Sequence, residues 1–357
     1  MADFSVEFAR FEEFVELRNS RTTTLPDIYR TGGTAAAANE AIAEEEEIPT
    51  IDFSLLMSDN PDQRAKIIKD IGEACNQWGC FIVVNHDMPE RLGTRMLEAV
   101  AGFFNLPAEE KTEYMSGELF GGVRFGTSNN LSAKDVRYWR EFLRVIVQPT
   151  FNSPAKPVNF REISGEYVRR MRGIYTELLR ALWESLGVSW SSVEEMLRME
   201  SAATIVLVNN FYPECPQPEA ALGQPPHTDN SLVSIVMQSR NISSLQVMHR
   251  GKWVPVKFIP NSLFFLAGDI LEVFMQIVSN GIYKSLLHRV KVSSERSKIS
   301  VVSFIGTSLE SVVAPLPQLV DGADRPAAFR AVTYKEYIEL QKTQMLLGKS
   351  CLDHLRL

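Results

Sequence analysis

The pattern of hydrophobic and polar residues divides the chain near residue 200. Before that point, apolar residues recur at helical spacing over residues 61–77, 89–104 and 166–186, which predicts three amphipathic helices. Two short runs, IPTIDFSLL from Ile48 and CFIVVNH from Cys80, are apolar and rich in β-branched residues, so we expect strands there. The first part of the chain is therefore predicted to be mainly helical.

After Ala202 the pattern changes to short alternating runs separated by turn residues. These runs are TIVLVNNFY, SLVSIVMQ, SSLQVMH, KWVPVKF, NSLFFLAG, YKSLLHRV and KISVVSFIG. Strands this short at this spacing favour a β-sandwich or a closed double-sheet roll over a βαβ array. Arg250-Gly251 and Asn280-Gly281 predict hairpin turns. With a last helix expected over residues 333–347, the predicted fold class is mainly β with flanking helices.

Residues 1–47 differ in composition from the rest of the chain. A short amphipathic helix is predicted there, because phenylalanines recur at helical spacing: Phe4, Phe8, Phe11 and Phe14. The acidic, low-complexity stretch TAAAANEAIAEEEE follows at residues 34–47, and either a frayed helix or a solvated linker fits it. We divide the chain at these changes of pattern into residues 1–47, 48–200, 201–310 and 311–357.

Charge and cysteine content restrict the partners of the protein. The chain carries 37 basic and 44 acidic residues, a formal charge of −7, which argues against a nucleic-acid backbone as partner. The first residues do not resemble a signal peptide, and charged residues interrupt the longest apolar stretch. We therefore expect a cytoplasmic monomer with no membrane partner. Four cysteines lack CxxC spacing and are expected to be reduced: Cys75, Cys80, Cys215 and Cys351.

Three residues of the β-rich part form a candidate metal site. His227 and Asp229 project to the same face if the segment is extended, and a β-roll can bring the strand that carries His288 over them. Two histidines and one carboxylate on one face are the facial triad that holds Fe(II) in non-haem oxygenases and leaves positions open for cosubstrate and dioxygen. The three residues alone do not decide the matter, because H-x-D occurs by chance and a lone buried histidine is usually a hydrogen-bonded core residue.

Several spaced motifs in order make the sequence recognisable. They include IPTIDFS, ACNQWGCFIVVNH, FFNLPAEEK, NNFYPECPQPE, PPHTD, GKWVPV, SNGIYKSLLHRV and KISVVSF. From Ile48 to the C-terminus the chain resembles the plant 2-oxoglutarate- and Fe(II)-dependent dioxygenases, in the branch that includes anthocyanidin synthase and flavonol synthase. The resemblance implies that residues 48–200 are the non-haem dioxygenase amino-terminal module. It also implies that residues 201–310 are a double-stranded β-helix, or jelly-roll, core and that residues 311–357 are a helical carboxy-terminal segment.

The resemblance also implies roles for individual residues. His227, Asp229 and His288 correspond to the iron ligands, whereas His86 corresponds to a histidine that is not a ligand. Contacts to the cosubstrate 2-oxoglutarate are implied for Asn210, Tyr212, Lys298 and Ser300. Dioxygen is the second cosubstrate, and ascorbate is the expected reductant.

Four departures from the family pattern stand out. Lys298 replaces the arginine of the Arg-x-Ser motif, so the cation is kept and the bidentate fork is lost. Ser243-Ser244 replaces the glycine before Leu245, and Asp87 replaces the glycine after His86. The stretch Gly268–Gly281, which includes Phe274–Val278, is longer than expected. Arg296 is the alternative cation on the same strand face, but it lies one strand repeat, about 6.6 Å, away, so we favour Lys298.

The substrate is expected to be a small specialised metabolite such as a flavonoid or phenylpropanoid, an alkaloid or a terpenoid. The resemblance places Phe142 and Arg144 along the substrate wall, and Val208 and Phe304 are further candidates from the strands that flank the metal site. Each aromatic or aliphatic member fits the core of a β-roll equally well, and Arg144 fits either recognition of an acidic group or an ordinary surface charge. Together they suit an aromatic or polycyclic substrate.

The implied reaction is hydroxylation, desaturation or demethylation, since Asp229 keeps the triad complete. Two other readings use the same fold. One is an ascorbate-dependent oxidase of the aminocyclopropane-carboxylate oxidase type. The absence of the arginine that binds 2-oxoglutarate in the family pattern favours this reading. The other is a non-catalytic binding protein, whose mark would be a broken triad.

Overall fold

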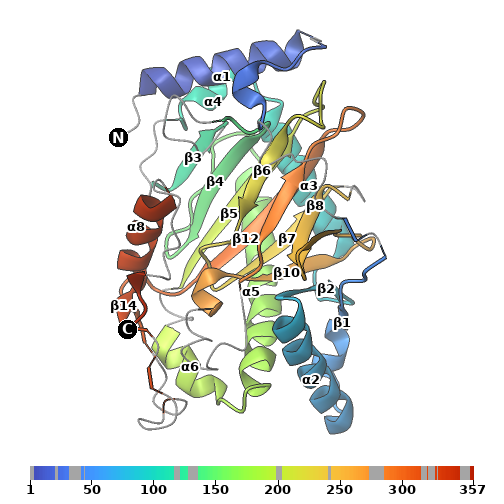
Figure 1. The fold of residues 1–357 in the computed structure, drawn as a ribbon, viewed down its shortest axis with the longest axis vertical. Coiled ribbons are helices and arrows are strands. Elements are labelled where there is room, and N and C mark those ends of the chain that lie inside the picture. Colours follow the sequence, from blue (N-terminus) through green and yellow to red (C-terminus); the bar gives the residue numbers. More distant parts are fainter. Residues whose placement is uncertain are drawn as a thin grey trace.

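Two β-sheets face each other in the computed structural model, and helices cover the outer face of the larger sheet (Figure 1). The structure describes residues 4–20, 23–31, 42–43, 45–115, 121–127, 136–197, 203–239, 243–272, 285–314, 320, 326–327, 329–345 and 354–357. The larger sheet has the strand order β1-β2-β10-β7-β12-β5-β4-β3, and the smaller has the order β6-β11-β8-β9. This arrangement is the predicted jelly roll.

The strands and helices have the following bounds. The strands of the larger sheet are β1 (Thr50–Asp52), β2 (Cys80–Val84), β3 (Val123–Gly126), β4 (Glu141–Gln148), β5 (Thr204–Tyr212), β7 (Val233–Gln238), β10 (Leu263–Ala267) and β12 (Lys298–Gly306). The smaller sheet contains β6 (Leu222–His227), β8 (Leu245–His249), β9 (Lys252–Pro255) and β11 (His288–Lys291), and a separate pair is formed by β13 (Val312–Val313) and β14 (Val332–Thr333). The α-helices are α1 (Phe4–Asn19), α2 (Pro61–Gln77), α3 (Glu90–Phe104), α4 (Ala108–Thr112), α5 (Phe160–Glu184), α6 (Trp190–Leu197) and α8 (Tyr334–Met345).

The larger sheet has a different environment on each face. Odd-numbered residues of β4, β5 and β12, such as Leu143, Leu207 and Val301, pack with α3 and α5 in the main hydrophobic core. Even-numbered residues of the same strands, such as Val208 and Val302, face the smaller sheet across the interior of the roll. A side chain on an even position of β4, β5 or β12 therefore points toward the space between the sheets.

Local sequence explains most of the helices that were predicted. The side chain of Asn60 accepts hydrogen bonds from the backbone of Asp62 and Gln63, and Pro61 occupies the first turn, so α2 begins where the pattern predicts. Its apolar face, with Ile67 and Ile71, is buried. The prediction for α5 is wrong at its start, because the helix begins at Phe160, which is buried in the core.

The strands β3 and β4 were not predicted. β4 alternates buried and half-buried residues, but charged residues occupy the positions that would mark an apolar run, as in EFLRVIVQ. It pairs with β5 from Glu141 to Gln148, so the amino-terminal part of the chain extends the same sheet as the β-rich part. The Asn280-Gly281 turn and the insertion around Phe274–Val278 lie outside the described residues.

The turn between β8 and β9 corrects one prediction. Arg250 and Gly251 both adopt positive φ, 48° and 77°, as a tight hairpin requires, so the predicted turn is confirmed. The position of His249 directly before this turn predicts an exposed side chain. It is buried, because its ring stacks on Trp78 at 3.7 Å between centroids, and Glu46 approaches its Nε2 at 3.6 Å.

The amino-terminal helix is attached to the sheet through a buried charge cluster. Phe11 and Phe14 of α1 are fully buried, and Phe14 packs on Trp139 with ring centroids 5.0 Å apart. Arg18 of α1 donates to the carboxylate of Glu141 at the start of β4. The other carboxylate oxygen accepts from Lys111, 3.2 Å away, and both Glu141 and Lys111 are almost completely buried. α1 therefore lies across the end of the sheet beside β3 and β4 (Figure 1).

Replacing Glu141 with glutamine is expected to lower the free energy of unfolding by about 3 kcal/mol, because Lys111 is then left as a buried cation without its counter-charge. The change in urea midpoint at constant slope measures this loss. A matched control is Asp70→Asn, which removes an exposed pair with Lys66 and is expected to cost less than about 1 kcal/mol. Equal effects of the two variants would contradict the assigned importance of the buried cluster.

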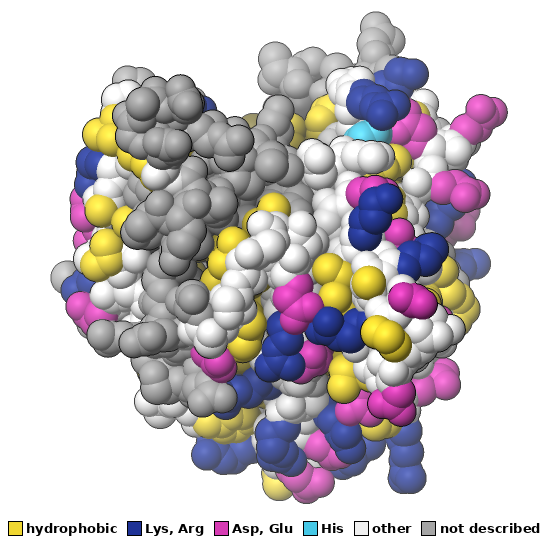
Figure 2. Space-filling view, turned by 90° about the horizontal axis from the view of Figure 1, so that it is seen from below, with side chains coloured by type: hydrophobic (Ala, Val, Ile, Leu, Met, Phe, Trp, Pro, Cys, Tyr) yellow, Lys and Arg dark blue, Asp and Glu magenta, His cyan; other side chains and the backbone are white. Residues whose placement is uncertain are grey.

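The surface mixes charges of both signs. On the face in Figure 2, lysine and arginine side chains lie among aspartates and glutamates. Pairs such as Lys66–Asp70 and Lys69–Glu73 on α2 show this arrangement at the level of single contacts. Among the described helices, none is long and apolar enough to cross a membrane. Three described cysteines are buried with free thiols, namely Cys75, Cys80 and Cys215, whereas Cys351 lies outside the described residues.

Candidate active site

The structure brings His227, Asp229 and His288 together at one end of the roll. His227 is the last residue of β6, and His288 is the first residue of β11 and lies directly opposite it in the antiparallel pair. Asp229 follows β6 by two positions. One carboxylate oxygen of Asp229, Oδ1, lies 3.6 Å from Nε2 of each histidine, and the two rings are 4.1 Å apart. All three potential ligand atoms lie within 4.8 Å of one another.

Backbone hydrogen bonds hold both histidines with Nε2 toward the site. Nδ1 of His227 donates to the carbonyl of Pro225 at 2.8 Å, and Nδ1 of His288 donates to the carbonyl of Leu286 at 2.9 Å. Each bond fixes the tautomer and leaves a lone pair on Nε2. Burial, and then the ring of His288, hold the pKa of His227 well below its ordinary value. His227 is therefore held as a neutral ligand.

These residues fit Fe(II). Two imidazoles and one carboxylate are the donor set that non-haem iron uses, and no cysteine takes part in this cluster of described residues. Gln224 adds a polar neighbour, because its amide nitrogen lies 2.7 Å from Nε2 of His227. A metal bound at that lone pair takes the place of the bond from Gln224.

A group of polar side chains lies on the facing sheet. Asn210 and Tyr212 of β5 stand opposite Ser300 and Lys298 of β12 in the strand register. The amide of Asn210 lies 3.4 Å from Oγ of Ser300. All four side chains are buried and occupy even positions, so they point into the roll. The residues that the resemblance assigned to the cosubstrate are therefore assembled on one wall.

Lys298 is a buried cation with a neutral partner. Its Nζ donates to Oγ of Ser244 at 2.7 Å and lies 5.7 Å from the centre of the Tyr212 ring. In the part of the chain that the structure describes, no carboxylate lies within ion-pair distance of it. Burial lowers the pKa of Lys298 to about 7. Arg296, the alternative cation, is exposed, which agrees with the choice of Lys298.

Two of the departures from the family pattern touch each other. Ser244 stands at the position of the usual glycine, and its hydroxyl is the group that meets Lys298. Sequence alone gave no reason to connect them, because they are 54 positions apart. The structure shows that the lysine side chain, which is shorter than an arginine, and the hydroxyl of Ser244 are in direct contact.

Arg140 is a polar residue of this region that sequence reasoning missed. It precedes β4, is 3% exposed, and its Nη1 donates to Oδ1 of Asn210 at 2.9 Å and to Oε1 of Gln224 at 2.8 Å. Through Gln224 it is connected to His227. The only sequence signal was its position two residues before Phe142, on the same face of an extended strand.

The predicted substrate residues share the inner face of the larger sheet. Phe142 pairs with Asn210, and Arg144 pairs with Val208. Phe142, Arg144 and Val208 therefore occupy adjacent positions of one wall. Phe142 is buried, and Arg144 and Val208 are half-buried. Phe304 lies on β12 one strand further and is partly buried against the interior cluster. All four residues thus lie on the inner face of the larger sheet, and their role in substrate binding stays a prediction.

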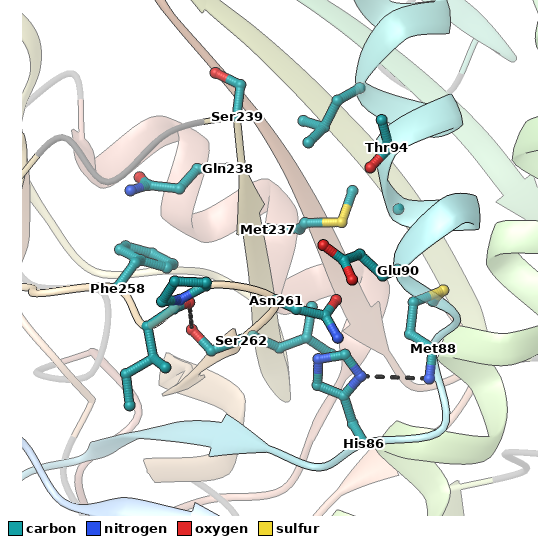
Figure 3. A pocket seen from close by; sticks show the side chains of 15 residues that line it. His86, Met88, Glu90, Thr94, Met237, Gln238, Ser239, Phe258, Asn261 and Ser262 are labelled. Carbon is teal, nitrogen blue, oxygen red and sulfur yellow. Dashed lines mark hydrogen bonds between the residues drawn. The ribbon is translucent and has the colours of Figure 1, made fainter.

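A separate hollow lies away from the triad. It has a volume of about 200 Å³ and is bordered by His86, Glu90, Met237, Asn261 and other residues of α3, β7 and the segments that follow β2 and precede β10 (Figure 3). Nδ1 of His86 accepts from the backbone of Met88 at 3.3 Å, and none of the triad residues borders the hollow. His86 is therefore not part of the metal cluster, as predicted.

Comparison with known families gives two matches along the chain. Residues 204–307 match the 2OG-Fe(II) oxygenase superfamily, and residues 48–163 match the family described as non-haem dioxygenase in morphine synthesis N-terminal. The first match contains the triad, Lys298 and Ser300. The second contains β1 to β4, with Phe142 on β4, and also Arg140, which precedes β4.

Individual proteins are similar over nearly the whole chain. "2-oxoglutarate-dependent dioxygenase 19" of Oryza sativa subsp. japonica is 39% identical over 90% of this chain and 94% of its own length. "Flavanone 3-dioxygenase 2" of the same organism is 33% identical over 93% of this chain and 94% of its own. A crystal structure of JOX2 in complex with 2OG, Fe and JA aligns with a TM-score of 0.80 and 27% identity, over 91% of this chain and 92% of that chain.

Proposed function

Because this chain belongs to the 2OG-Fe(II) oxygenase superfamily, we propose that it oxidises a small molecule at Fe(II) held by His227, Asp229 and His288. The observation that carries the proposal is the preorganised triad, in which backbone carbonyls orient both imidazoles toward one carboxylate. Iron, 2-oxoglutarate and dioxygen together supply the oxidising chemistry, with succinate and carbon dioxide as co-products. The chain binds, orients and shields the reactants.

The cosubstrate is held on the wall opposite the triad. 2-Oxoglutarate is a dianion, and its distal carboxylate needs a cation where water is excluded. Lys298 supplies that cation, with hydroxyl groups of Ser300 and Tyr212 as donors and Asn210 beside them. The carboxylate also gives Lys298 the counter-charge that the described residues do not offer. The buried position of Lys298 therefore supports a site that binds an anion.

Cosubstrate affinity is expected to depend on pH through Lys298. Its pKa is lowered to about 7 by burial, and the carboxylate binds the protonated amine. Below that pKa the amine is already charged, so affinity is constant; above it, affinity falls by about tenfold for each pH unit. Anaerobic titrations with 2-oxoglutarate from about pH 6 to pH 9 measure this slope. A flat profile across neutral pH would contradict the role of the amine.

The substrate faces the inner wall formed by β4, β5 and β12. Phe142, Val208 and Phe304 offer apolar and aromatic surface, which suits a small specialised metabolite such as a flavonoid, alkaloid or terpenoid, and Arg144 adds a cation. The reaction on it is hydroxylation, desaturation or demethylation. We place the protein in the cytoplasm as a monomer, and the buried free thiols support a reducing compartment.

The requirement for 2-oxoglutarate tests the proposal against the ascorbate-dependent oxidase. A panel of aromatic and polycyclic metabolites is incubated aerobically with the iron-loaded protein, with or without 2-oxoglutarate and with ascorbate as reductant throughout. We expect substrate-stimulated succinate release only when 2-oxoglutarate is present. Product formation with ascorbate alone would favour the ascorbate-dependent oxidase, and bound iron without turnover of any kind would favour a non-catalytic binding protein.

A further inference from the structure

We propose that the substrate is an organic anion, and that its acidic group is bound by the arginine face, which we define as Arg124, Arg140 and Arg144 around the ring of Phe142. The inference deepens the proposed function and rests on it. It assigns the substrate a chemical class: a small acid with an apolar or aromatic body. Three observations carry it, namely the partners of Arg140, the register of the other two arginines, and the position of Phe142.

Arg140 is a buried cation whose hydrogen-bond partners are neutral. It is 3% exposed, and it donates to the side-chain oxygens of Asn210 and Gln224. Within the described part of the chain, no carboxylate lies at ion-pair distance from it. A buried charge of this kind is costly unless a counter-charge joins it.

The expected reactants leave Arg140 without that counter-charge. Asp229 and one carboxylate of 2-oxoglutarate offset the two charges of iron, and Lys298 offsets the second carboxylate. One positive charge then remains at Arg140, next to Gln224 and His227. A negatively charged substrate would supply the counter-charge that Arg140 lacks.

Arg124 and Arg144 extend the positive charge along the same wall. They stand directly opposite each other in the pairing of β3 with β4. Like charges in this position repel, and both side chains are half-buried. Burial and the neighbouring Arg124 lower the pKa of Arg144 to about 10, so the guanidinium is still charged at neutral pH. Two half-buried guanidinium groups placed side by side are typical of a site that binds an anion.

Phe142 gives the arginine face an apolar centre. The guanidinium carbons of Arg140 and Arg124 lie 5.4 Å and 5.9 Å from the centre of its ring. The ring extends over Gly126 on β3, where a side-chain Cβ would come within 3.0 Å of it. The wall thus combines a flat hydrophobic surface with guanidinium groups beside it, which matches a planar or aromatic acid.

Matched pairs of acids and amides test the inference by binding, without turnover. The iron-loaded protein with 2-oxoglutarate is kept anaerobic, and the visible band of the iron–2-oxoglutarate complex is followed during titration with benzoate, phenylacetate, cinnamate and naphthoate and with the corresponding amides. We expect at least one acid to perturb the band at a concentration at least about tenfold lower than its amide, as for a charge-assisted hydrogen bond. Equal responses, a preference for amides, or no response to any acid would overturn the proposal.

Charge-removing variants locate the effect. In Arg124→Gln/Arg144→Gln the preference for acids is expected to fall at least about tenfold, whereas Arg170→Gln, an exposed arginine of α5 paired with Asp87, is expected to keep it. Loss of preference in the Arg170 control, or its persistence in the double variant, would contradict the arginine face. The visible band before acid is added distinguishes failure of the proposed function from failure of this inference. If the band is absent, the proposed function is wrong. If the band is present but acids are not preferred, only this inference is wrong.

Discussion

Replacing His288 with alanine is expected to abolish substrate-stimulated succinate formation. Removing a residue that only orients a metal ligand lowers activity by roughly 10- to 100-fold, and we expect a larger loss here. The reason is that Nε2 of His288 is one of only three ligand atoms in the cluster of described residues, so two ligands remain. Iron content after loading with Fe(II) and desalting, measured together with succinate release, checks both parts of this prediction.

His249→Ala is the matched control for His288→Ala. His249 is also buried, but its ring stacks on Trp78 and it takes no part in the metal cluster. We expect the control to lose some stability and to keep its iron. A variant without His288 that still binds one equivalent of iron and turns over would show that the triad is not the metal site.

Replacing Lys298 with alanine is expected to weaken 2-oxoglutarate binding by about 100-fold, which corresponds to the ~3 kcal/mol lost when one partner of a buried charge pair is removed. The iron site is expected to survive, because Lys298 contacts Ser244 and Tyr212 and none of the three ligands. Anaerobic titration with 2-oxoglutarate at about pH 6.5, where the wild-type amine is mostly charged, measures the loss. Unchanged affinity would remove Lys298 from the cosubstrate site.

Arginine at position 298 probes how Lys298 and Ser244 depend on each other. Nζ of Lys298 already lies 2.7 Å from the Ser244 hydroxyl, so a longer guanidinium has no room beside it. Lys298→Arg alone is therefore expected to bind 2-oxoglutarate more weakly than the wild type, and Ser244→Gly in the same chain is expected to restore binding. The double variant should also lose the pH dependence above neutrality, since a guanidinium stays protonated. Additive effects of the two substitutions would contradict the coupling.

Elements with a regular pattern were predictable from the sequence, and those whose pattern is interrupted were not. α2 and β12 have uniform periodicity over their whole length, and the prediction of both is confirmed. β4 was missed because Arg144 and Glu141 occupy strand positions that are apolar in an ordinary core strand. Those charges belong there because Glu141 joins a buried ion cluster and Arg144 faces the roll.

The site was predictable where motif and chemistry coincide. His227 and Asp229 share a face by spacing alone, whereas their approach to His288 needs the antiparallel pairing of β6 with β11, which no local pattern encodes. The contact of Ser244 with Lys298 and the position of Arg140 depend on such long-range pairing as well. His249 was placed wrongly because a hairpin turn predicts exposure, and stacking on Trp78 from α2's end overrides it.

In the proposed site the triad holds Fe(II), and the wall with Lys298 holds 2-oxoglutarate beside it. Anaerobic titration of the Fe(II)-loaded protein with 2-oxoglutarate, followed through the visible charge-transfer band, tests both at once. We predict a saturable band with one equivalent of 2-oxoglutarate, absent without iron and absent in His288→Ala. Iron bound at the triad with no band at any 2-oxoglutarate concentration would show that this wall does not hold 2-oxoglutarate at the metal.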